Sequence, residues 1–270
     1  MNPSQPAAAT AAGARTMKAA IYRRFGGPDV VRIEEIAQPA PRAGEVFIRV
    51  MASTVSVADH RVRSRNVPKG LVALTALTLG VFGGLTAKAF LGMAAIKSGD
   101  TVLINGASGA VGTAAIQLAK HLGAHVTAVS SGANRELVES LGADSFIDYT
   151  AADFTAVGTT YDVVMDCVGN APFARVQGSI APGGALLLVI ADLRGMLGAR
   201  GQSRRSGKLV TFGGLKLTYT AGDVAYLVGL AEEGKYRAVI DRTYNLADVV
   251  EAHRFVDTGR KRGNVVLRFP

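Results

Sequence analysis

The sequence has only one cysteine, Cys167, among its 270 residues. A single thiol excludes an intrachain disulfide and any zinc site built from several cysteines. It also favours a reducing compartment, so we expect a cytoplasmic protein. Aromatic residues are sparse at 6%, whereas hydrophobic residues reach 49%. This composition is typical of a folded globular chain, and the length suits one large domain or two ordinary ones.

Acidic residues are missing from two basic clusters that carry part of the net charge of +9. Such clusters can meet nucleic acid or an anionic cofactor. The first has no interleaved aromatic residues for stacking on bases, so we expect no nucleic-acid partner. We interpret the first as a solvated loop and the second as a solvated chain end. The first comprises Arg194, Arg200, Arg204, Arg205 and Lys208, and the second Arg260, Lys261, Arg262 and Arg268.

Charge is also absent between Lys69 and Lys88, in the run KGLVALTALTLGVFGGLTAK. Eighteen uncharged residues approach the length of a membrane span. Its threonines and glycines weaken that interpretation, and we expect no membrane partner. Residues 1–16, MNPSQPAAATAAGART, lack the basic start and apolar stretch of a signal peptide. We interpret them as a flexible tail.

Strand and helix signals divide the chain into a β-rich start, a regular alternation after about residue 100, and an end, from about residue 223, that departs from this alternation. The first strands are predicted over 17–22 and 45–50. Mostly apolar strands alternating with helices predict a parallel sheet covered on both faces. The predicted strands lie at 101–106, 125–130, 145–149, 161–168, 185–191, 208–212, 236–244 and 264–269, and the helices at 110–122, 134–141, 171–180, 223–233 and 247–257.

A glycine-rich loop, GASGAVG (106–112), joins the strand TVLIN to a helix. In a dinucleotide fingerprint Gly106 allows the tight turn, Gly109 lets backbone approach a pyrophosphate, and Gly112 permits close helix packing. The helix N-terminus then offers free N–H groups to the phosphates. The position between strand and helix supports this interpretation over a merely glycine-rich turn. The candidate phosphate-binding residues are Gly106, Ser108, Gly109, Ala110, Val111 and Gly112.

The end of the next strand indicates which dinucleotide binds. NAD sites place an acid there to hold the ribose hydroxyls. This chain has Ser130, Ser131 and then Arg135, with no acid before Glu136. Small hydroxyls with a nearby guanidinium suit a 2′-phosphate. The sequence therefore favours NADPH, although Arg135 can also be read as an ordinary residue of the helix surface.

Several further segments occur in a characteristic order. None of the seven tyrosines has a lysine four residues later, which excludes the Tyr-x-x-x-Lys pair of short-chain dehydrogenases. The segments are MKAAIYRRFGGPDVVRIEEIAQPAPRAGEVFIRVMAS, GLTA, NGASGAVGTAAIQLAKHLGA, SLGADSFIDY, YDVVMDCVG, PGGALLLV and RKRGNVVLRF. Together they resemble the medium-chain dehydrogenase/reductase superfamily, and within it the zinc-free quinone oxidoreductase branch.

The resemblance implies an α/β fold with two domains. A Rossmann doubly wound parallel sheet would occupy 82–235 and bind NADPH, and a truncated GroES-like β-barrel remnant would occupy 17–81 and 236–270. The barrel is shortened because only about thirty residues separate Val55 from Gly84, far fewer than the family's pattern. Its exposed edge would be sticky, so we expect a homodimer.

The resemblance also implies roles for individual residues. Thr86 would lie near the nicotinamide and take part in catalysis, and Ser56, in VSVAD, could hydrogen-bond a substrate carbonyl or simply fill a strand end. The basic partner of the 2′-phosphate falls at Asn134 or Arg135. The remaining implied cofactor contacts are Tyr149, Cys167, Val168, Gly169 and Asn264.

Two functions follow from these expectations. The first is zinc-independent, NADPH-dependent reduction of quinones or α,β-unsaturated carbonyls by hydride transfer, with no metal site. The second is NADPH binding without redox turnover, in an interaction protein or a pocket used for a non-redox step such as cyclisation. The shortened barrel keeps the second open.

Overall fold

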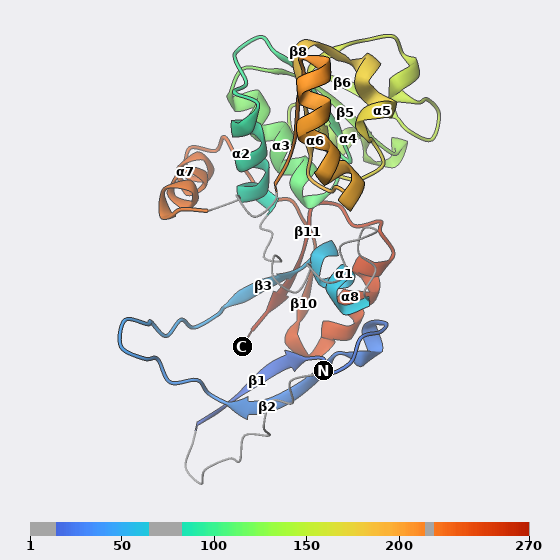
Figure 1. Cartoon of the computed structure of the whole chain (residues 1–270). Coiled ribbons are helices and arrows are strands. Elements are labelled where there is room, and N and C mark those ends of the chain that lie inside the picture. The colour runs from blue at the N-terminus through green and yellow to red at the C-terminus, as the bar shows by residue number, and fades with distance from the viewer. Residues whose placement is uncertain (1–14, 65–82, 214–218, 270) are drawn as a thin grey trace. The chain divides into compact units, whose positions relative to one another are not determined.

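The computed structural model describes residues 15–64, 83–213 and 219–269. They form two compact units (Figure 1). The smaller unit contains 15–64, 242–259 and 265–269, and the larger unit contains the remaining described residues. Residues 236–241 and 260–264 thus belong to the larger unit, although the predicted ranges put them in the smaller one. Most of the predicted tail and residues 69–82 of the uncharged run lie outside the described residues.

The larger unit is built on a six-stranded parallel sheet, which confirms the predicted α/β fold. Residues of the central strand β4 alternate between two cores. Val102 and Ile104 pack in one hydrophobic cluster, and Leu103 packs in the other. The strand order is β6-β5-β4-β7-β8-β9, with β4 at Thr101–Asn105, β5 at His125–Ser130, β6 at Ser145–Asp148, β7 at Tyr161–Asp166, β8 at Ile180–Leu188 and β9 at Leu209–Phe212.

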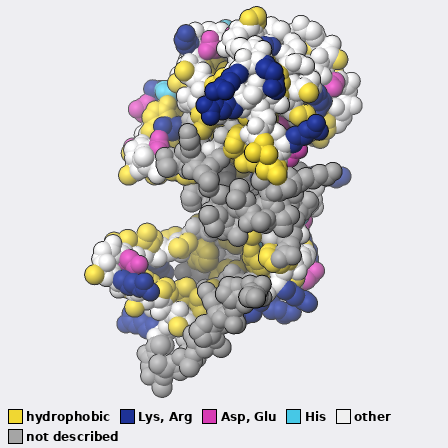
Figure 2. All heavy atoms as spheres, viewed as in Figure 1, with side chains coloured by type: hydrophobic (Ala, Val, Ile, Leu, Met, Phe, Trp, Pro, Cys, Tyr) yellow, Lys and Arg dark blue, Asp and Glu magenta, His cyan; other side chains and the backbone are white. Residues whose placement is uncertain are grey.

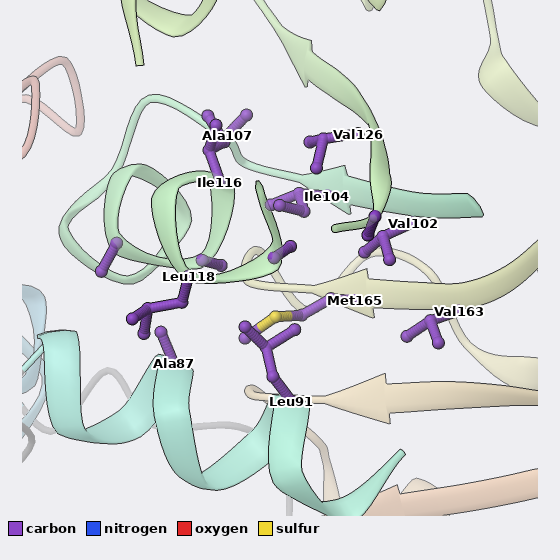
Figure 3. Close-up of a cluster of buried hydrophobic side chains, with 14 of the residues drawn as sticks. Ala87, Leu91, Val102, Ile104, Ala107, Ile116, Leu118, Val126, Val163 and Met165 are labelled. Carbon is purple, nitrogen blue, oxygen red and sulfur yellow. The ribbon is translucent and has the colours of Figure 1, made fainter. Parts of the chain in front are cut away.

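Helices cover both faces of this sheet, as the two cores require. Ala87 and Leu91 from α2 and Leu118 from α3 pack in the same cluster as Met165 of β7 (Figure 3). Ala199 from α6 and Val176 from α5 pack in the opposite cluster. The α-helices are α2 (Gly83–Met93), α3 (Ala110–His121), α4 (Arg135–Ser140), α5 (Phe173–Val176), α6 (Leu193–Ser206) and α7 (Ala221–Glu232), and the 3-10 turns are Gly132–Asn134, Phe154–Ala156 and Gln177–Ser179.

The smaller unit contains two small sheets and a separate core. Strands β1 (Thr16–Ile21) and β2 (Arg32–Ala37) pair antiparallel. The other sheet has the order β10-β11-β3, from β10 (Ile240–Asn245), β11 (Asn264–Arg268) and β3 (Ala52–Val55). Its core packs β3, β11 and α8 (Val249–Asp257) together with Val31. The other elements are α1 (Val57–Ser64) and the 3-10 turns Pro28–Val30 and Leu246–Asp248.

The strand predicted over 45–50 is wrong, because the structure assigns no strand there. Val46 is 80% exposed and Ile48 is 71% exposed. A strand needs a neighbour for its backbone N–H and C=O groups, and none of the strands among the described residues pairs with this segment. A short apolar run alone therefore does not make a strand.

The loop predicted for the first basic cluster is also wrong, since most of it forms helix α6. The Asp192 carboxylate accepts a hydrogen bond from Gly195 N–H at 2.7 Å and caps the first turn. Gly207 ends the helix with φ +68, a left-handed conformation that suits glycine. None of the helices within the described ranges is both long enough and apolar enough to cross a membrane.

Candidate functional site

The glycine loop begins with a turn that only glycine makes without strain. Gly106 has φ +82, and a Cβ atom there would lie 2.7 Å from Cγ2 of Val168. The N–H groups of Gly106 and Ala107 both donate to the carbonyl of Val129, at 3.1 and 3.0 Å. These two bonds hold the loop against the carboxyl end of β5.

The two later glycines of the loop serve different purposes. A Cβ atom at Gly112 would lie 2.3 Å from the carbonyl oxygen of Gly106, so close packing of α3 on the loop requires glycine. A Cβ atom at Gly109 would meet nothing nearer than 3.5 Å, and its φ of −78 is ordinary. The fold itself does not require glycine at 109. An open backbone at this position fits the close approach of a ligand.

The N-terminus of α3 presents unpaired donors beside this open backbone. Thr113 N–H bonds to the carbonyl of Gly109 at 2.9 Å, so the helix ladder begins only there. The earlier N–H groups of the first turn have no partner four residues back, and no side chain from the described part of the chain caps them. The first turn also contains no acid. Free N–H groups and the positive end of the helix dipole suit a phosphate.

Residues 261–264, which are distant in sequence, also contact the glycine loop. Gly263 N–H donates to the carbonyl of Ser108 at 2.8 Å, and Gly263 bridges to Gly109. Asn264 donates its side-chain amide to the carbonyl of Val239 at 3.1 Å. The buried Lys261 ammonium donates to the carbonyl of Gly263 at 2.6 Å. Burial lowers the pKa of Lys261, and Asp241 opposes that shift.

A buried carboxylate organises the loop that follows β7. Asp166 is fully buried and accepts hydrogen bonds from the backbone N–H groups of Val168, Gly169 and Ala171, at 3.0, 3.1 and 2.9 Å. Asn105, at the end of β4, donates to the same carboxylate at 2.9 Å. This network fixes the predicted ribose-contact loop beside Gly106. The sequence reasoning missed both residues, although each closes an apolar strand with a polar side chain.

The three predicted residues of that loop lie around the same turn. Burial, and then the Asp166 charge, raises the pKa of the Cys167 thiol, which keeps it protonated. The Val168 side chain is exposed, and Gly169 has φ +92, where a Cβ atom would clash with Ile190. The exposed part of this loop is therefore backbone and one apolar side chain.

The end of β5 holds the residues predicted to select the dinucleotide. Ser130 is buried and donates its hydroxyl to the carbonyl of Ser131 at 3.3 Å. The Ser131 hydroxyl accepts from Asn134 at 3.1 Å. The Arg135 guanidinium lies 4.6 Å from the Phe146 ring centroid and donates to Glu139 at 3.3 Å.

Asp148, the last residue of β6, and Tyr149, which follows it, lie next to the end of β5. The Tyr149 side chain is 63% exposed, and its N–H donates to the carbonyl of Ser130 at 3.2 Å. Asp148 is an acid that sequence reasoning missed, since it ends the next strand, β6, and not β5. Hydrogen bonds from Thr150, first from its side chain, and also from Gly132 N–H, lower the pKa of Asp148. Its carboxylate is already engaged in holding this turn.

The two predicted catalytic residues belong to different units. Thr86, in the larger unit, is almost fully buried, and its hydroxyl lies 3.1 Å from that of Tyr219. Gly83, at the start of the same helix, would place a Cβ atom 2.7 Å from the carbonyl oxygen of Ala110, so α2 begins against the first turn of α3. Ser56, in the smaller unit, donates its hydroxyl to Asp59 at 2.8 Å as α1 begins.

The described residues contain no group of three or more His, Cys, Asp or Glu placed to hold a metal. Most of the predicted cofactor residues gather around the glycine loop, the loop after β7 and the end of β5. All of these belong to the larger unit, at the carboxyl ends of β4, β5 and β7. In open α/β sheets this edge is where ligands bind.

Comparison with known proteins places this arrangement in a family. A family model described as zinc-binding dehydrogenase matches residues 141–267. A chloroplastic quinone oxidoreductase QR1 from Triphysaria versicolor is 35% identical over 196 residues, which cover 68% of this chain and 59% of that protein. This chain therefore spans about three fifths of that relative's length.

Two further comparisons cover more of each chain. A chloroplast envelope quinone oxidoreductase homolog from Arabidopsis thaliana is 30% identical, over 84% of this chain and 73% of that protein. The structure of a quinone oxidoreductase from Coxiella burnetii has the same fold, with a TM-score of 0.80, 24% identity and coverage of 94% of this chain and 99% of that one. The chain belongs to the medium-chain dehydrogenase/reductase superfamily, in its quinone oxidoreductase-like branch.

Proposed function

We propose that this protein is an NADPH-dependent, zinc-independent oxidoreductase that reduces quinones or α,β-unsaturated carbonyls. The observation that carries the proposal is the open backbone at Gly109 beside the uncapped first turn of α3. The protein's own packing does not require glycine there, and a pyrophosphate would fill the space against free N–H groups. The relatives named as quinone oxidoreductases support the reaction class.

The preference for NADPH rests on the end of β5. Ser131 and Arg135 would offer a hydroxyl and a guanidinium to a 2′-phosphate. Tyr149 is 63% exposed, and its backbone N–H bonds to the Ser130 carbonyl, so it lies at the same end of β5. Asp148 is the nearby acid that would favour NADH. Its hydrogen bonds to Thr150 and Gly132 already occupy the carboxylate, so it is less available to a ribose hydroxyl.

The bound cofactor would supply the hydride, and the chain would supply binding and orientation. The Asp166 network would hold the 167–169 loop in place. Thr86, whose hydroxyl lies 3.1 Å from that of Tyr219, would lie near the nicotinamide. The proposed role of Ser56 is to donate a hydrogen bond to the substrate carbonyl. That role requires its hydroxyl to leave Asp59, to which it donates in this structure.

The test is a turnover assay on the purified chain. NADPH is mixed with a panel of quinones and enones, and the absorbance of the reduced nicotinamide is followed with and without protein. The proposal predicts protein-dependent, saturable consumption of NADPH with at least one acceptor. Consumption should persist after dialysis against a chelator, since no metal is used.

Binding of NADPH without turnover on any acceptor would instead support the second function, a nucleotide-binding protein without redox activity. The exposed apolar residues of the 46–51 segment favour keeping this alternative, because a wall that encloses substrate normally buries such side chains. Failure to bind NADPH at all would reject both functions.

A further inference from the structure

Helix α6 presents an exposed face that the proposed function does not use. At about 100° per residue, its exposed residues share one arc of roughly 140°. Leu197 is 77% exposed and Leu193 is 39% exposed, on a helix whose only fully buried residue is Ala199. Figure 2 shows basic side chains gathered near α6 with hydrophobic side chains next to them. The exposed residues are Leu193, Arg194, Leu197, Arg200, Arg204 and Arg205.

The four arginines of this face have no partner among the residues that the structure describes. None of them forms an ion pair or a hydrogen bond with any residue in the described ranges. The helix contains no acid, and the capping Asp192 is engaged with Gly195. Lys208, the remaining member of the cluster, is different, since its ammonium donates to the carbonyls of Gln177 and Ile180.

The helix is held rigidly enough to present this face as a unit. The Ser203 hydroxyl donates to the carbonyl of Ala199 at 3.0 Å and accepts from Val210 N–H of β9 at 2.8 Å. Over the eleven residue-to-residue steps from Arg194 to Arg205, a helix rises about 17 Å. Successive arginines are at most about 9 Å apart along the axis, close to or below the Debye length of about 8–10 Å, so their fields overlap in one positive field.

We propose that this face of α6 docks the protein on an anionic phospholipid surface. Guanidinium groups attract anionic headgroups, and an exposed leucine between them gains by entering the apolar boundary below. A nucleic acid would use the arginines but would gain nothing from Leu197, and the helix has no aromatic residue for stacking on bases. The contact is peripheral and involves no membrane span. It departs from the expectation of no membrane partner, which was drawn from the uncharged run between Lys69 and Lys88 and not from this helix.

The test is co-sedimentation of the full chain with vesicles at low salt. Vesicles of phosphatidylcholine with about 30% phosphatidylserine should bind the protein, and vesicles of phosphatidylcholine alone should not. Binding should fall steeply as salt is raised. Each arginine near such a surface is worth about fivefold in partitioning, so R200Q/R204Q/R205Q should weaken binding by about 100-fold.

Two variants separate this face from general charge and from other partners. K18Q/R24Q/K97Q removes three exposed cations elsewhere and should keep vesicle binding within a fewfold of the wild type. Leu197→Ser leaves the charge unchanged and should weaken binding by about tenfold. Far-UV circular dichroism and NADPH titration of every variant check that the larger unit remains folded.

Three results would overturn the proposal. The first is no binding to the phosphatidylserine vesicles by a folded wild-type chain, and the second is an equal loss in the two triple variants. The third is an unchanged partition of Leu197→Ser together with competition by duplex DNA, which would assign the face to nucleic acid. An acidic protein partner is indicated if the arginine face binds soluble acidic polypeptide and not vesicles.

Discussion

Asn105 donates its side-chain amide to the buried carboxylate of Asp166 at 2.9 Å, where β4 and β7 end side by side. The same amide reaches the side-chain oxygen of Asn170 at 2.7 Å. These bonds connect the strand that enters the glycine loop to the loop that follows β7. The shape of the candidate cofactor site therefore depends on one carboxylate that is itself fully buried.

Asp166→Asn should weaken NADPH binding by about tenfold or more and destabilise the larger unit. An amide nitrogen is unable to accept the N–H bonds that the carboxylate oxygen accepts, so buried donors lose their partners at about 1–3 kcal/mol. Calorimetric titration and urea unfolding measure the two effects. Asp162→Asn is the matched control, since Asp162 bonds to Thr101 between the same strands at their opposite ends. That variant should lose stability but keep its NADPH affinity, and equal losses of affinity would contradict this account.

Arg135→Gln should raise the dissociation constant for NADPH by about tenfold and leave that for NADH nearly unchanged. The guanidinium is the nearest permanent cation in sequence to the end of β5, and it pairs with phosphate more strongly than an amide does. Glu139→Gln is the control, since it removes the helical partner of Arg135 and keeps the cation. A parallel loss for both dinucleotides would remove the basis for NADPH preference.

The smaller unit should lose stability as the pH falls below about 6.5, the ordinary value for histidine. Burial, and then the charge of Arg63, lowers the pKa of His253, with His60 acting in the same direction and Asp59 and Asp257 opposing it. The pKa of His253 is therefore lower in the folded state than in the unfolded state. The contribution of the neutral imidazole to stability is complete above the unfolded pKa and is lost as the pH falls through the folded pKa.

His253→Gln removes that titration and should flatten the dependence of the unfolding midpoint on pH between 8 and 5. His125→Gln, which changes an exposed histidine of the larger unit, is the control and should leave the slope unchanged. Thermal unfolding followed by circular dichroism at each pH gives the slopes. An unchanged slope in His253→Gln would show that another group causes the acid sensitivity.

The proposed homodimer predicts a solution mass of twice the 28.0 kDa chain. Light scattering after size-exclusion chromatography measures it. Val46 and Ile48 are the most exposed apolar residues of the 45–51 segment, and V46K/I48K should shift the protein toward the monomer. A monomeric wild-type chain would contradict the proposal that a second copy of the chain buries the 45–51 segment.

The sequence predicted the larger unit well because its signals are local. Strand β4, the glycine loop and α3 follow one another within a few residues, and each carries its own pattern of apolar residues or glycine. Helix α6 was missed because three glycines and many arginines dilute its apolar pattern, although Asp192 and Gly207 mark both ends. The segment 45–50 was predicted as a strand because its pattern is right, but pairing depends on a neighbour that local pattern does not reveal.

In the candidate site, too, the local features could be predicted from the sequence and the contacts between distant residues could not. Gly106, Gly109 and Gly112 follow from spacing, and their separate roles emerge only when neighbouring atoms are known. The contact of Gly263 with Ser108 and the bond between Asn105 and Asp166 join residues far apart in the chain. Sequence periodicity does not encode such pairs.

The direct test of the central claim is a calorimetric titration of NADPH into the wild-type chain and into Gly109→Ala, with Gly112→Ala beside them. The added methyl at 109 meets no atom nearer than 3.5 Å, so the fold should lose less than about 1 kcal/mol while NADPH affinity falls by about tenfold or more. The added methyl at 112 lies 2.3 Å from a carbonyl oxygen and should destabilise the fold itself by about 1–3 kcal/mol. The assignment of this loop to the cofactor would be contradicted if a folded Gly109→Ala bound NADPH as tightly as the wild type. It would also be contradicted if the wild type did not bind NADPH at all.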